Sequence, residues 1–343
     1  MVSRAFITGL AGLTISADER AFLREAAPWG LILFKRNIGT PDQVAEIIQS
    51  FRDVLGWHAP VLIDQEGGRV QRLGPPQWPV YPPGAAYGAI YDRDPTSGLA
   101  AARLGGRLIA SDLFRLGLDV DCLPIADVPV PGGDPVIGDR AYGLEPGKVA
   151  AIAGAVAQGL LAGGVLPVLK HLPGHGRAKA DSHKALPVVD TPRDLLEKTD
   201  FAAFKPLAGL PLGMTAHVVF SAIDPRAPAT TSVTMVSQVI RGAIGFTGLL
   251  MSDDVSMGAL SGTIAERSHA ALAAGCDVVL HCNGDLTEMA QVAGASPVLS
   301  GLSAERAGAA LALRRAPDAF DVADARRIFD EMVASGRFVS PSV

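Results

Sequence analysis

The sequence has few of the features that mark secreted, membrane-spanning or nucleic-acid-binding proteins. Its three cysteines, Cys122, Cys276 and Cys282, are an odd number without C-x-x-C spacing, which argues against a secreted disulfide scaffold. Its 30 Lys and Arg stand against 35 Asp and Glu, a net charge of −5, so no basic excess attracts nucleic acid or an anionic membrane. No apolar run approaches the roughly 20 residues of a membrane span. We expect a cytoplasmic protein without a nucleic-acid or membrane partner.

Three further signals are missing. The apolar stretch at the N-terminus is interrupted by Thr8 and Gly9 and is not followed by an A-x-A cleavage site, so we do not expect a secretory signal peptide. No Pro- or Gly-rich linker and no internal repeat divides the chain. The segment Gly9-Leu-Ala-Gly12 lacks the G-x-G-x-x-G spacing of an open dinucleotide-binding sheet.

The chain does contain a regular alternation of short apolar runs and longer helical patterns. Hydrophobic residues make up 48% of it and charged residues 19%, enough for a large core. The expected strands are Ala5–Gly9, Gly30–Phe34, Val61–Asp64, Asp119–Pro124, Leu166–Leu169, Leu212–Ala216, Leu249–Ser252 and Asp277–His281. The expected helices between them include Ala17–Ala27, Pro41–Leu55, Pro95–Leu116, Pro146–Leu161 and Pro192–Leu207. Continuous apolar runs of this length are typical of strands buried on both faces.

Eight such strands alternating with helices predict an α/β fold, a (β/α)8 TIM-type barrel forming one domain over residues 1–343. The tail over residues 304–337 reads as two more helices on the outside of the barrel. In this fold the chemistry sits at the carboxyl ends of the strands. The polar residues that follow each expected strand are therefore the candidates for a site.

The third strand is followed by Asp64-Gln-Glu-Gly-Gly-Arg-Val-Gln-Arg72. One interpretation is a helix-capping turn with a surface salt bridge. The other is a polar clamp, in which carboxylates accept hydrogen bonds from sugar hydroxyls and planar guanidinium groups donate them.

The fifth strand is followed by a loop with three histidines and an aspartate, from Lys170-His-Leu-Pro-Gly-His-Gly to Asp181-Ser-His183. His171, His175, His183 and Asp181 could ligate zinc, which would make the protein a metal-dependent hydrolase. The spacing of Asp181 and His183 indicates instead a carboxylate that orients an imidazole. The Gly- and Pro-containing segment 174–183 reads as a mobile lid.

The seventh strand ends in Ser252-Asp-Asp-Val-Ser-Met257. Its acids Asp253 and Asp254 point to opposite sides of an extended backbone, so only one faces the barrel mouth. They could cap the next helix, or one could act as nucleophile or base. The residues alone do not say which. Weaker candidates also follow strands: Arg36, Asn37, Asp127, Asp139, Arg140 and His217.

Four motifs in this order resemble those of family 3 glycoside hydrolases over the chain from about Phe6 to Cys282. They are Asp64–Arg72, Lys170–Gly176, Asp181–His183 and Ser252–Met257. The likeness is to single-domain bacterial β-N-acetylglucosaminidases of peptidoglycan recycling. It implies that Asp253 is the catalytic nucleophile and that His183 is the general acid/base, with Asp181 as its partner. It also implies a set of residues that bind the N-acetylglucosamine ring: Asp64, Arg72, Arg140, Lys170 and His171.

The resemblance implies a retaining exo-enzyme that removes terminal β-1,4-linked N-acetylglucosamine from fragments ending in 1,6-anhydro-N-acetylmuramic acid, with or without stem peptide. It implies a monomer that takes a small-molecule sugar and needs no metal or cofactor. An imidazole acid/base places no second anion beside Asp253, which leaves phosphorolysis open as an alternative. A sugar-binding protein without turnover is a further alternative, against which the presence of Asp253 and His183 argues.

Overall fold

A computed structural model describes residues 3–335 of the protein. Eight parallel strands close into a barrel. In chain order they are β1 (Arg4–Thr8), β2 (Pro28–Leu33), β3 (Val61–Ile63), β6 (Val120–Asp121), β7 (Leu166–Leu172), β9 (Leu212–Thr215), β11 (Leu249–Asp254) and β12 (Val278–His281). Each strand pairs with the next along the chain, and β12 pairs with β1. The predicted (β/α)8 barrel is confirmed.

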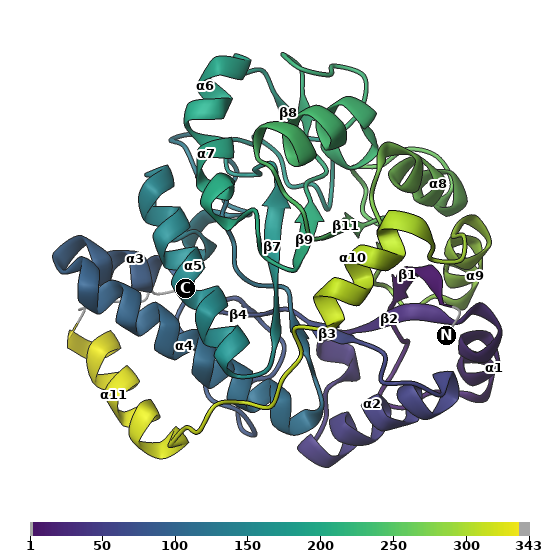
Figure 1. Cartoon of the computed structure of the whole chain (residues 1–343), viewed down its shortest axis with the longest axis horizontal. Coiled ribbons are helices and arrows are strands. Elements are labelled where there is room, and N and C mark those ends of the chain that lie inside the picture. Colours follow the sequence, from purple (N-terminus) through teal and green to yellow (C-terminus); the bar gives the residue numbers. More distant parts are fainter. Residues whose placement is uncertain (1–2, 336–343) are drawn as a thin grey trace.

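Helices surround the barrel on the outside (Figure 1). They are α1 (Ala17–Ala26), α2 (Pro41–Leu55), α3 (Gly84–Arg93), α4 (Pro95–Leu116), α5 (Pro146–Ala162), α6 (Arg193–Lys198), α7 (Asp200–Phe204), the π-helix η5 (Met235–Ala243), α8 (Ile264–Ala274), α9 (Leu286–Ala295), α10 (Gly301–Leu311) and α11 (Val322–Ser335). Within residues 3–335, none of them is long and apolar enough to cross a membrane.

Local sequence signals start and stop these helices. The Ser16 side chain accepts a hydrogen bond from the Glu19 N–H, and the Glu19 side chain reaches back to the Ser16 N–H, a capping box. Thr40 caps α2, whose first residue is Pro41, where a missing N–H costs nothing. Gly56 ends α2 at φ 72°, a conformation that favours glycine.

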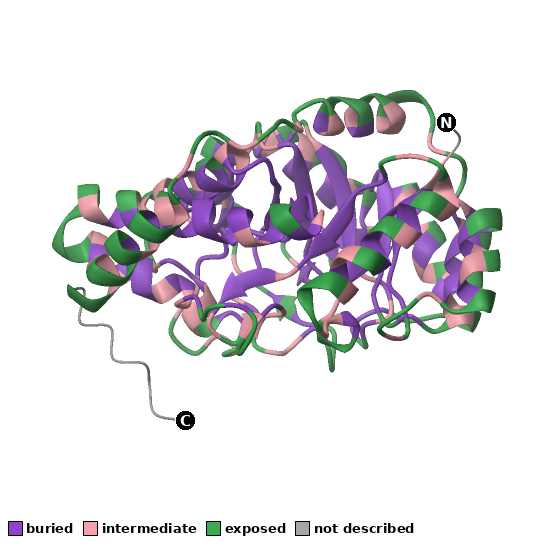
Figure 2. Ribbon diagram, turned by 90° about the horizontal axis from the view of Figure 1, so that it is seen from below, coloured by how far each residue is buried: buried purple, intermediate pink, exposed green. Residues whose placement is uncertain are grey.

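Two apolar clusters result from the alternation of side chains along the strands. Side chains such as Leu62 and Met251 fill the barrel interior, while their neighbours pack outward against the helices. Ala307 and Ala310 of α10 join the interior cluster, so α10 covers one end of the barrel. Figure 2 shows the buried residues gathered in the central strands and the exposed ones on the outer helices.

The prediction of one continuous helix over Pro192–Leu207 is wrong. This segment breaks at Thr199 (φ −117°, ψ −82°) into α6, α7 and a short 3₁₀ turn. The Thr199 hydroxyl donates to the Leu195 carbonyl, and the Arg177 guanidinium contacts both Thr199 and Asp200. A side chain from the preceding loop therefore binds at the break.

The outer tail differs from the prediction in its bounds. The two helices expected over 304–337 are α10 and α11, which are separated by ten residues of non-helical chain, and residues 336 and 337 lie outside the described part. Of the two, α11 packs on the outer helices α3 and α4, whereas α10 closes the barrel. Helices α3, η5, α8 and α9 were not among the ranges expected.

Candidate active site

A pocket of about 300 Å³ lies at the carboxyl ends of the barrel strands. The eight residues implied by the family resemblance all line it, namely Asp64, Arg72, Arg140, Lys170, His171, Asp181, His183 and Asp253. The weaker candidates Arg36, Asn37, Asp127, Asp139 and His217 are not among its lining residues. The structure thus brings together side chains from the carboxyl ends of β7 and β11 and from the segments that follow β3, β6 and β7. This is the end of the barrel at which such folds carry their active sites.

The first motif forms a tight hairpin, β4 (Gln65–Gly67) with β5 (Val70–Gln71). Gly67 (φ 93°) and Gly68 (φ 56°) make its turn, and a Cβ on Gly67 would lie 2.3 Å from the Pro82 carbonyl oxygen. Both positions therefore require glycine. The buried Gln65 amide accepts hydrogen bonds from the N–H groups of Arg72 and Leu73. These hydrogen bonds close the hairpin and bring the Arg72 side chain next to Asp64.

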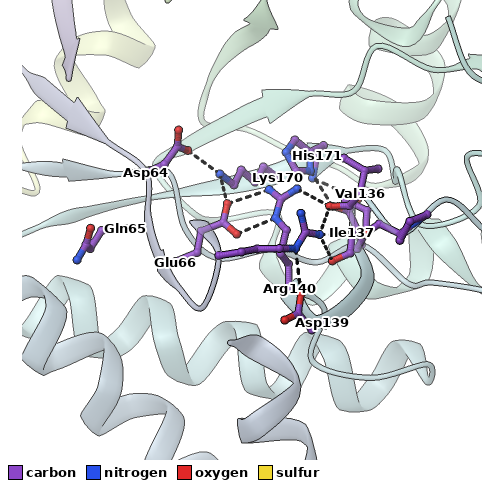
Figure 3. Close-up of polar contacts among 12 residues, drawn as sticks. Asp64, Gln65, Glu66, Val136, Ile137, Asp139, Arg140, Lys170 and His171 are labelled. Carbon is purple, nitrogen blue, oxygen red and sulfur yellow. Dashed lines mark hydrogen bonds and ion pairs between the residues drawn. The ribbon is translucent and has the colours of Figure 1, made fainter. Parts of the chain in front are cut away.

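Five side chains of alternating charge form one network in the pocket. Figure 3 shows the part of it formed by Asp64, Lys170, Glu66 and Arg140. Asp64 binds the Arg72 guanidinium and the Lys170 ammonium, each at 2.9 Å. Lys170 Nζ also lies 2.6 Å from Glu66 Oε1. Glu66 in turn binds Arg140 through two parallel hydrogen bonds of 2.9 Å, the strong bidentate geometry.

Burial makes this network depend on complete pairing. The Lys170 and Glu66 side chains are only 2% and 4% exposed. Burial raises the pKa of the Asp64 and Glu66 carboxyls, but their cationic partners outweigh this effect. Lys170 and Arg72 hold the pKa of Asp64 far below its ordinary value. Arg140 and Lys170 lower the pKa of Glu66 to about 2. Burial lowers the pKa of Lys170, and Asp64 with Glu66 raises it to a net value above the ordinary one. All three groups are charged at neutral pH.

Acid should weaken the fold through Glu66. Its pKa drops from 4.5 to about 2 on folding, so its ionised form stabilises the protein above about pH 4.5, and that contribution is lost as pH falls toward 2. We expect Glu66→Gln to cost less stability at pH 3 than at pH 6. Thermal unfolding midpoints of wild type and variant across this range measure the difference. A difference that does not change with pH would contradict the assignment.

The two adjacent acids have different surroundings. The Asp254 carboxylate accepts hydrogen bonds from the Ser256 N–H, the Ser256 hydroxyl and the Cys282 N–H. Asp253 Oδ1 accepts one from the Asp254 N–H, at 2.8 Å, and Oδ2 accepts none from residues 3–335. Asp254 is therefore held in the loop, and Asp253 keeps an oxygen for a ligand.

Asp253 stays ionised in spite of its burial. Burial raises the pKa of its carboxyl, but His217, His171 and the Asp254 N–H bring it below the ordinary value. His217 is fixed between the Thr230 hydroxyl and the Asp254 carbonyl, at 2.7 and 2.9 Å. An ionised carboxylate with a free oxygen suits a nucleophile.

Asp181 and His183 form the expected pair. His183 Nδ1 lies 2.7 Å from Asp181 Oδ1, which also accepts the His183 N–H at 2.9 Å. Burial raises the pKa of the Asp181 carboxyl, but these two hydrogen bonds bring it below its ordinary value. The His183 side chain is 64% exposed, and its Nε2 is left for a ligand. The carboxylate fixes the imidazole with Nε2 outward.

The histidines of the metal-dependent alternative bind other partners. His171 Nδ1 lies 2.7 Å from Asp127 Oδ2, and His175 Nε2 lies 3.1 Å from the Ser182 hydroxyl. Residues 3–335 contain no group of three His, Cys, Asp or Glu side chains placed to hold a metal ion. The residues predicted for that alternative do not form a ligand set in this arrangement.

Sequence reasoning missed the role of Glu66 and gave Asp127 little weight. Asp64 and Glu66 are two residues apart in an extended segment, so they share one face. That alternation was the available signal. Asp127 is fully buried and binds the side chain of His171 and the backbone N–H of His175. Nothing in its local sequence indicates that partner 44 residues away.

Residues 5–310 match the N-terminal domain of glycosyl hydrolase family 3. The chain belongs to this family. It is a glycoside hydrolase, and the pocket described above is its candidate active site. Family 3 membership also accords with the closed barrel and with the order of the four motifs along the chain.

Named relatives agree with this assignment. The chain is 40% identical over 286 residues to the beta-hexosaminidase of Xanthomonas euvesicatoria, covering 82% of this chain and 84% of the relative. Among solved structures, NagZ from Neisseria gonorrhoeae in complex with N-trifluoroacetyl-D-glucosamine superposes with a TM-score of 0.85 at 29% identity, covering 98% of both chains. The beta-N-acetylhexosaminidase of Beutenbergia cavernae gives 0.74 at 28% identity, covering 96% of both.

Proposed function

We propose that this family 3 enzyme removes terminal, non-reducing β-1,4-linked N-acetylglucosamine by a retaining mechanism. The observation that carries the proposal is the placement of an ionised Asp253, with one free carboxylate oxygen, in the same pocket as the Asp181–His183 pair. The relatives named beta-hexosaminidase and NagZ support the choice of sugar.

In the first step Asp253 attacks the anomeric carbon while the glycosidic oxygen departs. His183, as imidazolium, donates the Nε2 proton to that oxygen. Asp181 at Nδ1 stabilises the imidazolium and so keeps the acid form available. The products are the free aglycone alcohol and a glycosyl ester on Asp253.

In the second step His183 is neutral and its Nε2 accepts a proton from water. The water oxygen bonds to the anomeric carbon and Asp253 leaves as carboxylate. Two displacements on the same carbon restore the β configuration. Retaining enzymes generally use two carboxyl groups about 5–5.5 Å apart, and here an imidazole takes the place of one of them.

The charged network is suited to hold one sugar ring. Carboxylates such as Asp64 accept hydrogen bonds from ring hydroxyls, and Arg72, Arg140 and Lys170 donate them. The Arg72 Nε is buried without a partner among residues 3–335 and is a further donor. A pocket of about 300 Å³ is at the small end of ligand sites, which favours a terminal monosaccharide.

The natural substrate we propose is a cell-wall fragment in which this sugar is linked to 1,6-anhydro-N-acetylmuramic acid, with or without stem peptide. The free enzyme would act as a cytoplasmic monomer, without metal or cofactor. The substrate is carried over from the resemblance of the motifs and the location from the composition of the chain, and all of these features stay predictions.

The test is release of nitrophenol from 4-nitrophenyl N-acetyl-β-glucosaminide in phosphate-free buffer containing EDTA. Turnover in which NMR detects the β-anomer of the released sugar first would support retaining hydrolysis without metal. Turnover that appears only with added zinc would favour the metal-dependent alternative. A requirement for phosphate would make the enzyme a phosphorylase, and binding without turnover would make it a sugar-binding protein.

Replacement of His183 by alanine should harm substrates with poor leaving groups most. A natural disaccharide needs protonation of its leaving oxygen, and such proton transfer contributes about 100- to 10,000-fold. A 2,4-dinitrophenyl glycoside needs almost none, so its glycosylation rate should change little. Steady-state and burst kinetics on both substrates measure this. Equal losses on both would argue against the acid role.

A further inference from the structure

The loop that carries Asp181 and His183 has a buried polar contact that the mechanism above does not use. Ser182 is only 3% exposed although both neighbours face the pocket or solvent. Its hydroxyl lies 3.1 Å from Nε2 of His175, which is also 3% exposed. The buried Ser182 lies between Asp181 and His183, whose side chains face outward, so its contact sets the orientation of both neighbours.

The backbone of His175 is held by Asp127, whose carboxylate also contacts a residue of the pocket. Its backbone N–H donates to Asp127 Oδ1 at 2.6 Å. The second oxygen of the same carboxylate binds the imidazole of His171, which lines the pocket. One buried carboxylate therefore connects a predicted sugar ligand with the histidine that contacts the loop.

The two ends of the loop are attached differently. At its start, Gly176 lies so close to Val128 that a Cβ would be 2.1 Å from the Val128 carbonyl oxygen, and the Asp134 N–H donates to the Ala178 carbonyl. Backbone carbonyls of Ser182 and His183 accept N–H groups from residues 259 and 258, at 3.1 and 3.3 Å. The side-chain contact of Ser182 is the buried one, because Ser182 and His175 are both 3% exposed.

We propose that the His175–Ser182 contact is a latch that holds residues 179–185 with His183 facing Asp253, and that Asp127 couples this latch to sugar bound at His171. His175 and Ser182 are then positioning residues. The proposal rests on the acid/base role proposed for His183. Burial and the nearby His171 lower the pKa of His175 to about 4, so it is neutral at the pH of the reaction and contributes no charge to the pocket.

The kinetic test compares Ser182→Ala with Ser182→Thr, which keeps the hydroxyl. Loss of one buried hydrogen bond should lower kcat/KM on a β-1,4-linked disaccharide about tenfold, with little change on a 2,4-dinitrophenyl glycoside. Threonine should restore most of the loss. Equal losses on both substrates, or no loss on either, would overturn the latch. His183→Ala in the same assay reports separately on the proposed acid role.

A second test does not depend on the chemistry. Lys179 and Lys184 are exposed on either side of the latch, so trypsin cleavage after them reports loop opening. We expect cleavage of Ser182→Ala to be about fivefold faster than that of wild type, at an unchanged thermal midpoint. N-acetylglucosamine should slow cleavage of wild type more than that of the variant. Cleavage of the variant at the wild-type rate would overturn the latch, whatever the role of His183.

Discussion

Replacement of Asp253 by alanine should lower kcat on 4-nitrophenyl N-acetyl-β-glucosaminide by at least about 10,000-fold, as for other catalytic nucleophiles. The reason is that the buried Asp253 carboxylate stays ionised and keeps one oxygen without a hydrogen-bond partner among residues 3–335. Asp64 is engaged by Arg72 and Lys170, and Asp254 by Ser256 and Cys282. The side chain points into the pocket, so the thermal midpoint should stay close to wild type.

The matched control is Asp254→Asn. Its carboxylate accepts three hydrogen bonds, two from Ser256 and one from Cys282 after β12, so this variant should lose stability by about 1–3 kcal/mol and lose much less activity than Asp253→Ala. Sodium azide should restore turnover to Asp253→Ala and give the α-glycosyl azide, because a small anion enters from the vacated face. Wild-type activity in Asp253→Ala, or a reversed order of the two variants, would sink the assignment.

Replacement of Glu66 by alanine should destabilise the fold by about 3–5 kcal/mol. This change leaves the Arg140 guanidinium without its bidentate partner and Lys170 with Asp64 alone, both in a buried site. One buried cation then lacks a carboxylate partner and a second keeps only one of its two, so the loss is far larger than for an exposed pair. Urea unfolding followed by circular dichroism measures it.

Glu66→Gln is the control for shape. It keeps the volume and one acceptor but not the charge, so its loss should lie between those of wild type and alanine. The salt bridge between Arg69 and Asp139 is a second reference, because both side chains are over a third exposed; Asp139→Ala should cost less than about 1 kcal/mol. A loss for Glu66→Ala as small as that of Asp139→Ala would mean that water screens the network.

The barrel itself could be predicted from the sequence because its signals are local. Short apolar runs bounded by Gly, Pro and polar residues give buried parallel strands, and residues such as Ser16 and Pro41 start helices without help from the rest of the chain. The one clear error in an expected helix, over Pro192–Leu207, occurred where Arg177 from the preceding loop, 22 residues earlier, binds at Thr199. Local propensity does not contain that contact.

The candidate site divides in the same way. The sequence by itself determined which residue types follow each strand, and the barrel rule placed Asp64, Lys170 and Asp253 at one end. Partner choice was decided only by the tertiary structure. Glu66 meets Arg140 from 74 positions away, and the free oxygen belongs to Asp253 because backbone N–H groups and Ser256 occupy Asp254. Such pairings depend on strand register and side-chain direction, which are set when the whole barrel closes.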